Sequence, residues 1–233
     1  LHILFQCQNH IIKNYQELKH AGYLGREDWG RMRYQMRRQP DRWQVHPNRL
    51  DSLLKHLKEV DRLPCIFFTF GRRRTEDLAW EASGLPPLLT SSEQSELRAM
   101  FGELCARFQL TGDRTAEAMG HLIERGVAYH HAGMLPTVKE VIERCFVSRL
   151  IKFIVTTETF ALGVNMPARS VVIDTLKKRI GGRFDLLRSR QFLQMAGRAG
   201  RRGMDEAGFV YLRINPTSVT YPEVMHLLHS KPE

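Results

Sequence analysis

The feature that most constrains the fold is a series of short apolar segments that alternate with helical patterns from residue 64 onward. The first segment, residues 65–70, is a continuous apolar run, as expected of a strand buried on both faces. Strands that are separated by helices predict a mainly parallel sheet covered on both sides, with right-handed crossovers. We expect strands over residues 65–70, 127–130, 151–155, 170–175 and 209–214.

The helices expected between these strands carry apolar residues three and four positions apart. The first opens at His46-Pro47-Asn48 and places Leu50, Leu53, Leu54 and Leu57 on one face. Another follows residue 74, two lie within residues 91–125, and one covers residues 136–149. Together with the strands, these helices predict a three-layer α/β domain.

The charge of the chain points to a polyanionic partner. The net charge is +10, and it is unevenly distributed. Residues 1–60 carry 11 basic and 6 acidic residues, residues 151–233 carry 13 and 7, and the middle is balanced. Residues 1–6 are typical of a strand whose neighbours lie outside the chain. Residues 8–45 are polar and basic, which indicates a surface arm or linker, with a nucleic-acid contact as the alternative.

The remaining composition excludes several classes of protein. The four cysteines are far apart and form no Cys-x-x-Cys pair, so we expect reduced packing residues and no metal site. No run of 18 apolar residues predicts a membrane span. We therefore expect an intracellular, cytoplasmic protein, and because the chain begins with Leu1 rather than Met, we expect a piece of something longer.

The most unusual stretch, residues 194–203, combines three arginines, three glycines and Gln194. Glycine inside a helix costs about 1 kcal/mol relative to alanine, and arginine is seldom buried without a partner, so this is a poor core element. Arg198 and Arg201 are three positions apart and would share one helix face. Two guanidinium groups on one face suit a triphosphate or another polyanion. The alternative is a solvated basic helix end.

Three further polar stretches directly follow predicted strands, at residues 69–74, 130–134 and 156–167. In parallel sheets, ligands bind beyond the carboxyl ends of the strands. Hydroxyl groups and free backbone amides at a strand-to-helix junction form a natural phosphate site. The alternatives are a solvated charge run in the first stretch, one buried and one exposed histidine in the second, and ordinary helix capping in the third.

In this order and spacing, the four stretches resemble the second RecA-like domain of superfamily 2 helicases, over roughly residues 46–230. Residues 67–73 are similar to motif IV, residues 130–134 to the histidine–glycine motif, residues 156–167 to motif V, and residues 194–203 to motif VI.

The run Gln-Met-Ala-Gly-Arg-Ala-Gly-Arg-Arg-Gly-Met-Asp resembles the superkiller-type, exosome-associated DExH-box RNA helicases, since related helicases usually have proline at the position of Arg202. Residues 175–178, with residues 184–185, are similar to a loop that these helicases carry before motif VI. Arg190 and Gln191 depart from the family, which often has an acidic residue there; we expect an effect on local packing only.

The resemblance implies roles for these residues. Arg198 and Arg201 would be arginine fingers for ATP, and Gln194 would contact the nucleotide or its attacking water. Gly197 and Gly200 would let the backbone approach the nucleotide. Motif V would couple the nucleotide to RNA through Gly163 and Asn165, and RNA phosphates would be held by Arg72, His131, Gly133, Thr156 and Thr157.

The sequence has no P-loop, and its only Asp-Glu pair, Asp205 and Glu206, does not follow an apolar strand. The resemblance therefore implies that residues 1–7 are the trailing strand of a first RecA-like domain, that residues 8–45 join the two domains, and that residues 46–230 form the second. ATP and Mg would be held mainly by the first domain, so we expect this piece alone to be inactive.

The partners implied are that first domain, single-stranded RNA or a 3′ RNA tail, and an RNA-degradation complex. A DNA helicase or translocase of the same superfamily and a non-catalytic nucleic-acid-binding RecA-like module are the alternatives.

Overall fold

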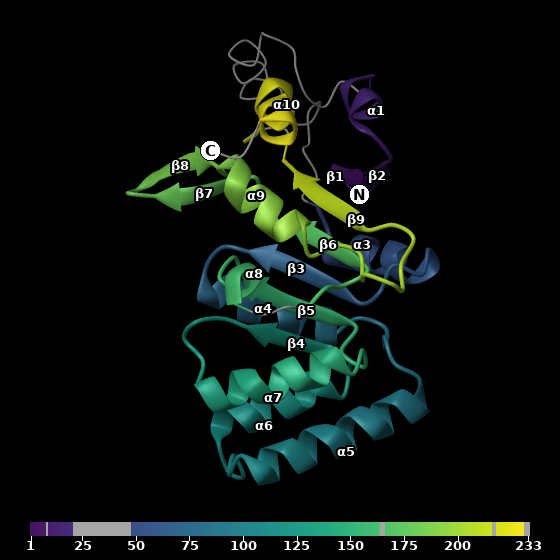
Figure 1. Cartoon of the computed structure of the whole chain (residues 1–233), viewed down its shortest axis with the longest axis vertical. Coiled ribbons are helices and arrows are strands. Elements are labelled where there is room, and N and C mark those ends of the chain that lie inside the picture. Colours follow the sequence, from purple (N-terminus) through teal and green to yellow (C-terminus); the bar gives the residue numbers. More distant parts are fainter. Residues whose placement is uncertain (8, 21–47, 164–165, 216–217, 231–233) are drawn as a thin grey trace, which may run out of the picture.

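The centre of the molecule is a seven-stranded sheet, seen in a computed structural model that describes residues 1–7, 9–20, 48–163, 166–215 and 218–230 (Figure 1). All neighbouring strands of the sheet are parallel except β1 and β2, which confirms the predicted parallel sheet. The strand order is β2 (His10–Ile12), β1 (His2–Cys7), β9 (Phe209–Ile214), β6 (Ser170–Ile173), β3 (Cys65–Thr69), β5 (Phe153–Thr157) and β4 (Val127–His130).

Helices complete the three-layer α/β architecture. They are α1 (Tyr15–His20), α3 (Leu50–Glu59), α4 (Arg72–Ser83), α5 (Ser91–Arg107), α6 (Arg114–Ile123), α7 (Pro136–Val147), α8 (Phe160–Gly163), α9 (Ser189–Ala196) and α10 (Tyr221–His229). In Figure 1, α8 and α9 lie in front of the sheet and α3 and α4 behind it, while α5, α6 and α7 gather beyond the β4 edge. None of the helices in the described part of the chain is both long and apolar enough to cross a membrane.

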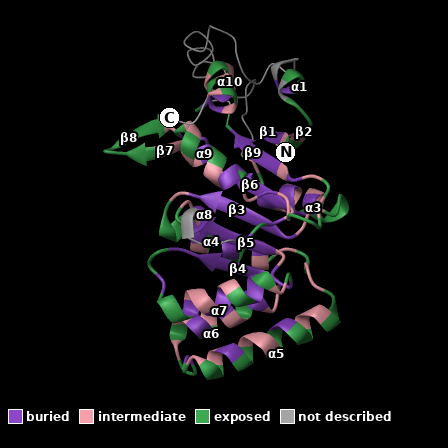
Figure 2. Cartoon of the chain, viewed as in Figure 1, coloured by how far each residue is buried: buried purple, intermediate pink, exposed green. Residues whose placement is uncertain are grey.

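The core forms where the sequence pattern predicts it. Every residue of β3 is buried, and Phe67 pairs in register with Val155 on β5 and Val172 on β6. Figure 2 shows the central strands buried throughout, whereas the helices expose their outer faces. The four leucines of α3 all face this core, as their spacing predicts.

The N-terminal strand is confirmed, but the expectation that its neighbours lie outside the chain is wrong. β1 pairs with β9 from His2 opposite Phe209 to Cys7 opposite Ile214, and its other edge pairs with β2. The strand is thus part of the same sheet as β3 and β9. The assignment of residues 1–7 and 8–45 to separate regions stays a prediction, and residues 21–47 lie outside the described residues.

Other differences lie at the ends of the predicted elements. β5 begins at Phe153 and continues through Thr157, two residues beyond the predicted end. A hairpin of β7 (Lys177–Ile180) and β8 (Arg183–Leu186) stands where the sequence indicated only a loop. Gly181 and Gly182 turn it with φ of 56° and 88°, a conformation that glycine adopts without strain.

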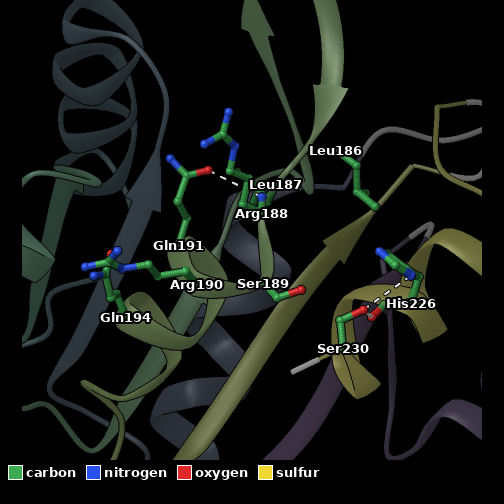
Figure 3. A pocket seen from close by; sticks show the side chains of 9 residues that line it. All are labelled: Leu186, Leu187, Arg188, Ser189, Arg190, Gln191, Gln194, His226 and Ser230. Atoms are coloured by element: carbon green, nitrogen blue, oxygen red, sulfur yellow. Dashed lines mark hydrogen bonds between the residues drawn. The ribbon is translucent and has the colours of Figure 1, made fainter. Parts of the chain in front are cut away.

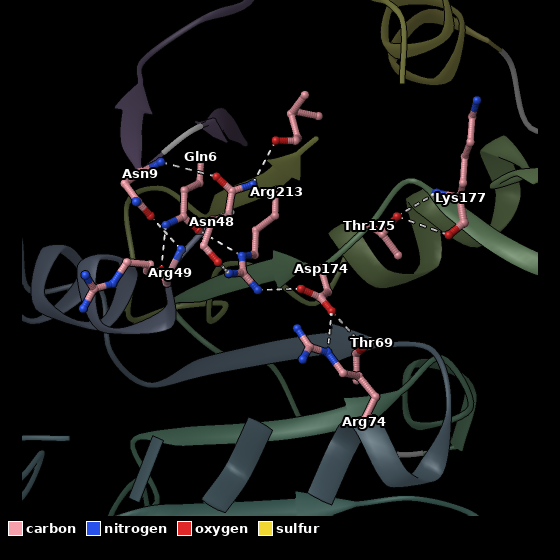
Figure 4. Close-up of polar contacts among 11 residues, drawn as sticks. Gln6, Asn9, Asn48, Arg49, Thr69, Arg74, Asp174, Thr175, Lys177 and Arg213 are labelled. Carbon is pink, nitrogen blue, oxygen red and sulfur yellow. Dashed lines mark hydrogen bonds and ion pairs between the residues drawn. The ribbon is translucent and has the colours of Figure 1, made fainter. Parts of the chain in front are cut away.

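A buried arginine joins the N-terminal strand, the start of α3 and the end of β6 (Figure 4). Only 4% of the Arg213 side chain is exposed. Its Nη1 donates to Asp174 Oδ1 at 2.5 Å, its Nε donates to Gln6 Oε1 at 2.9 Å, and its Nη2 donates to the carbonyl of Asn48. Burial lowers the pKa of Arg213, and the Asp174 carboxylate opposes that shift. This cluster links β9 to β1 and to the end of β6.

Candidate nucleotide and nucleic-acid site

The polar stretches that follow β3, β4, β5 and β6 lie at one edge of the sheet, because these strands are parallel. A cavity of about 560 Å³ opens at this edge. Its lining comes from the β3–α4 turn, the loop after β4, the loop after β5 and the β7–β8 hairpin, with the residues Phe70, Gly71, Arg72, Ala132, Thr157, Glu158, Thr159, Thr175, Lys177, Lys178, Arg179, Ile180 and Phe184. The structure therefore brings Arg72 and Thr157 to one cavity, as the sequence predicts.

The turn between β3 and α4 presents positive charge to this edge. Gly71 is the N-cap residue of α4 and has φ of 108°. The buried hydroxyl of Thr75 donates to the Gly71 carbonyl at 2.8 Å. Three arginines follow in the first turn, and all three are exposed. Cations at a helix N-terminus oppose the helix dipole, so an anion bound here would relieve an unfavourable arrangement.

His131 supports the loop after β4 from inside the protein. It is 5% exposed, and its ring stacks on Tyr129 with centroids 5.6 Å apart. The amide of Gly133 donates to Nδ1 at 3.1 Å, so Nε2 carries the proton and donates to Glu76 Oε1 at 2.8 Å. Both ring nitrogens are therefore occupied, and the predicted contact of His131 with an RNA phosphate is not available in this geometry. Its role is to shape the loop that carries Gly133.

Gly133 lies directly beside Arg72. A Cβ at Gly133 would lie 3.0 Å from both Cδ and Nη1 of Arg72, so any larger residue would push that side chain away. The two predicted phosphate contacts from motif IV and the histidine–glycine motif are thus adjacent in the structure.

His130 points to the opposite side from His131, as expected for neighbours at the end of a strand. It is also buried, at 6% exposure, so the alternative of one buried and one exposed histidine is wrong. Its Nε2 lies 2.8 Å from Glu143 Oε1, and its ring meets Phe160 edge-on at 4.8 Å. Burial lowers the pKa of His130, and the contact with Glu143 opposes this.

Motif V begins inside the sheet rather than beyond it. Thr156 is fully buried, and its hydroxyl donates to the His130 carbonyl at 2.8 Å. The predicted phosphate contact of this side chain is therefore incompatible with the structure, because β5 extends farther than its apolar run. Thr157 is half-buried and faces the cavity, with its hydroxyl 3.0 Å from that of Thr159. Gly163 ends α8, and Asn165 lies outside the described residues.

The motif VI loop is fastened to the segment that follows motif V. The amide of Ala168 donates to the Arg198 carbonyl at 3.0 Å, and the amide of Gly200 donates back to the Ala168 carbonyl at 2.7 Å. These two bonds form a parallel bridge between Ala168 and Ala199. The motif VI loop is therefore bonded directly to the residue that follows motif V.

Arg198 makes a second link between the same two motifs. Its Nε donates to the Ala161 carbonyl of α8 at 3.1 Å, and its Nη2 donates to the same oxygen. The guanidinium is thereby held by its Nε–Nη2 edge against a helix of motif V. Nη1 has no partner among the residues that the structure describes.

Arg201 is held in the same way, by a carboxylate. Its Nε lies 2.8 Å from Asp205 Oδ2, and its Nη2 lies 2.7 Å from Asp205 Oδ1. The Arg201 side chain is 15% exposed and that of Asp205 only 4%. This bidentate contact lowers the pKa of the Asp205 carboxyl and raises the pKa of Arg201, so both groups are charged at neutral pH.

Comparison with known proteins agrees with this geometry. Residues 89–203, which include the histidine–glycine motif and motifs V and VI, match the helicase conserved C-terminal domain. The chain is 40% identical to superkiller complex protein 2 of Homo sapiens over 185 residues, which cover 78% of this chain and 15% of that protein. The chain belongs to the superkiller-like DExH-box helicases. Its fold is a RecA-like α/β domain with a mostly parallel sheet.

Two other relatives support the same assignment of this helicase domain. It is 35% identical to antiviral helicase SKI2 of Saccharomyces cerevisiae over 178 residues, which cover 74% of the chain and 14% of the relative. It is 36% identical to exosome RNA helicase MTR4 of Homo sapiens over 171 residues, which cover 72% and 16%. The chain thus spans only about 15% of the length of such relatives.

The glycines of motif VI allow close contacts within the backbone of the helicase domain itself. Gly200 has φ of 89°, and a Cβ there would lie 3.2 Å from Gly208 Cα. A Cβ at Gly208 would lie 2.4 Å from the Ala199 carbonyl oxygen. The close approach at Gly200 in this structure is to the loop before β9, and its predicted approach to the nucleotide stays a prediction. Gly197 caps the end of α9 and is exposed.

Gln194 lies on α9 beside other polar residues of the same helix (Figure 3). It lines a second cavity, of about 830 Å³, between α9 and α10. Figure 3 shows Arg190 and Gln191 beside it, and the amide of Arg188 donates to Gln191 Oε1 at 3.4 Å. The departure from the family at Gln191 is thus accommodated by a contact at the start of α9.

The hairpin of the helicase domain is anchored at its base by two lysines. Lys178 Nζ lies 3.0 and 3.1 Å from the two carboxylate oxygens of Glu158 in motif V, and Lys177 Nζ lies 2.7 Å from Glu223 on α10. Phe184, near the hairpin tip, is 71% exposed. Sequence reasoning missed Glu158 and Lys178 as a pair because they are 20 residues apart and meet only in the folded chain.

Two other acidic residues of the site were not identified from sequence. Asp174 directly follows the buried strand β6, at the edge of the sheet where the cavity opens. A polar residue directly after a buried strand is a pattern that the sequence does show. Asp205 lies four residues after Arg201, the spacing of a helical ion pair, whereas from sequence the Asp205-Glu206 pair was only excluded as a metal-binding motif. No group of three or more possible metal ligands occurs in the described ranges.

Proposed function

We propose that this domain is the C-terminal half of an ATP-dependent RNA helicase core, and that it completes a nucleotide site with a first RecA-like domain of the same protein. The observation that carries the proposal is the pair Arg198 and Arg201. Both guanidinium groups come from one loop, both are held by their Nε–Nη2 edges, and the loop is bonded to motif V. Two such groups on a rigid support suit the oxygens of a γ-phosphate.

ATP and Mg fit this arrangement only in part. The arginines are phosphate ligands, whereas magnesium prefers carboxylates, and the described carboxylates of this site are already engaged by arginine or lysine. We therefore assign the metal and most nucleotide contacts to the first domain. When bound there, Mg and ATP supply the phosphoryl chemistry, and Arg198 and Arg201 stabilise charge on the transferred group.

RNA would bind along the carboxyl edge of the sheet through its phosphates. We assign phosphate contacts to Arg72 and Thr157, and shaping of the site to His131, Gly133 and Thr156. Because Arg198 holds α8 and the motif VI loop is bridged to Ala168, closure of the two domains on ATP would shift these phosphate contacts together. Phosphate contacts carry little sequence information, so we expect weak sequence preference.

The names of the relatives suggest the setting of this activity. One is a component of a superkiller complex and another is an exosome RNA helicase. We propose that the full-length protein acts on a single-stranded 3′ RNA tail and cooperates with an RNA-degrading complex.

The test uses the full-length protein with Arg201→Ala. RNA-stimulated ATP hydrolysis should fall by about 10³-fold or more, since arginine fingers typically contribute ~10³–10⁵. RNA affinity should be unchanged. Arg202→Ala removes the same charge from an exposed neighbour and should retain turnover. Normal turnover by Arg201→Ala would refute the finger assignment, and equal unwinding of matched DNA and RNA substrates would refute the RNA preference.

A further inference from the structure

Asp205 is built into the turn that carries Arg201. The Arg201 carbonyl accepts from the amides of Met204 and Asp205, both at 3.0 Å, and these bonds close the turn. Gly203 lies inside it with φ of 75°, a value that glycine tolerates. The Asp205 carboxylate also accepts a hydrogen bond from the Arg201 backbone amide at 2.9 Å. The carboxylate is therefore fixed to the backbone of the residue whose side chain it also binds.

The same carboxylate defines the plane of the Arg201 guanidinium. A bidentate contact between two planar groups fixes their relative orientation as well as their distance. Of the five N–H donors in a guanidinium, this contact uses one on Nε and one on Nη2. Nη1 has no partner among the described residues, so the edge that carries it is the one available to a ligand.

Two further observations indicate that Asp205 orients the Arg201 guanidinium for a ligand and does not withhold it from one. Arg198 is held by the same edge, although its acceptor is a neutral carbonyl. The shared feature of the two arginines is therefore the edge that is left available, not the charge of the partner. Asp205 also has a second arginine nearby, because Arg169 Nε lies 3.8 Å from Oδ1, while Arg169 Nη1 lies 2.5 Å from Asp61 Oδ2.

We propose that Asp205 is a positioning residue for ATP hydrolysis: it holds the Nε–Nη2 edge of Arg201 so that Nη1 faces the γ-phosphate when the two RecA-like domains close. This inference rests on the proposed role of Arg201 as a finger. Asp205 itself touches no substrate. Its effect should therefore appear in the transition state and not in the binding of ATP.

The experiment measures ATP hydrolysis by the full-length protein at saturating RNA, with Asp205→Asn and with Glu206→Gln as the control at the exposed neighbouring acid. For Asp205→Asn, kcat should fall by about 100-fold, the effect of misplacing a catalytic group by about 1 Å, while KM for ATP is unchanged. Affinity for ADP–aluminium fluoride, which mimics the transition state, should fall in parallel, and affinity for a non-hydrolysable ATP analogue should not. Glu206→Gln should behave as the wild type.

Two further variants separate positioning from a general loss of structure. In the Arg201→Ala background, Asp205→Asn should cause no additional loss of kcat, because its effect passes through Arg201. Asp205→Glu keeps the charge but displaces it by one methylene, so its kcat should lie between those of the wild type and Asp205→Asn. This variant serves as the test if Asp205→Asn does not fold.

An unchanged or increased kcat in Asp205→Asn, or an additive loss in the double variant, would overturn the proposal. An increased kcat would mean that Asp205 sequesters the finger. If Arg201→Ala itself retains turnover, the proposed function fails; if Arg201→Ala loses turnover but Asp205→Asn does not, only the role of Asp205 fails.

Discussion

The buried ion pair between Asp174 and Arg213 allows a quantitative prediction about stability. The variant Asp174→Asn removes one charge while leaving the shape of the side chain nearly unchanged. Arg213 would then keep its positive charge with 4% of its side chain exposed and without the Asp174 carboxylate beside it. Its bonds to Gln6 and to the carbonyl of Asn48 would remain, but neither partner is charged.

The expected loss follows from the burial of the pair. Removing one partner of a buried ion pair costs about 3–5 kcal/mol, because an uncompensated charge stays in a poorly solvated environment. The asparagine oxygen can still accept one hydrogen bond from Arg213, so we expect about 3 kcal/mol, the lower end of this range. The contacts of Asp174 with Thr69 and with the half-exposed Arg74 are longer, at 3.1 and 3.4 Å, and contribute less.

The matched control is Glu140→Gln. Glu140 pairs with Arg144 at 2.7 Å, almost as closely, but both side chains are more than 40% exposed. Exposed pairs of this spacing contribute about 0.3–0.5 kcal/mol. Urea unfolding at pH 7.5 measures both variants against the wild type. Equal losses of unfolding free energy in the two variants would refute the argument that burial, not distance, sets the value of these ion pairs.

Two other predictions concern packing and pH. Gly208→Ala should lower the free energy of unfolding by about 1–3 kcal/mol, because the added Cβ would overlap the Ala199 carbonyl. Gly102→Ala, in open space on helix α5, should raise the free energy of unfolding by about 1 kcal/mol. Urea unfolding that ranks the two variants the other way would contradict this prediction. Because burial lowers the pKa of His130, the folded protein binds fewer protons than the unfolded chain just below pH 6.5, so stability should fall as the pH drops from about 6.5, by at most ~1.4 kcal/mol per pH unit. His130→Gln should reduce this slope between pH 7.5 and 5.5 and His121→Gln, at an exposed position, should not; equal slopes in both would exclude His130 as its source.

Most of the sheet could be predicted because its central strands are buried on both faces. β3 is a continuous apolar run, and the same is true of most of β6 and β9, so local sequence was sufficient. The boundary of β5 was wrong because Thr156 is polar. Its hydroxyl is satisfied by the carbonyl of the neighbouring strand, a contact that sequence does not reveal.

The hairpin was not predicted because its strands lack apolar alternation, although the glycine pair at Gly181 and Gly182 is a turn signal. The partners of β1 depend on strand order, which places residues some 207 positions apart in one ladder.

The chemistry of motif VI was visible in the sequence, but its geometry was not. The spacing of Arg198 and Arg201 indicated a polyanion, and both residues do lie in one loop. Their acceptors, the Ala161 carbonyl and the Asp205 carboxylate, differ in kind and in distance along the chain. No periodicity distinguishes a guanidinium that points freely to solvent from one that is held by one edge.

Arg201 is proposed to act on ATP held by another domain, and single-turnover hydrolysis is the direct test of this role. The full-length protein is mixed with a substoichiometric amount of ATP and saturating RNA, and the rate of γ-phosphate cleavage is followed for Arg201→Ala and Arg202→Ala. We predict a cleavage rate at least ~10³-fold slower for Arg201→Ala and an unchanged rate for Arg202→Ala. A cleavage rate for Arg201→Ala equal to that of the wild type would contradict the claim.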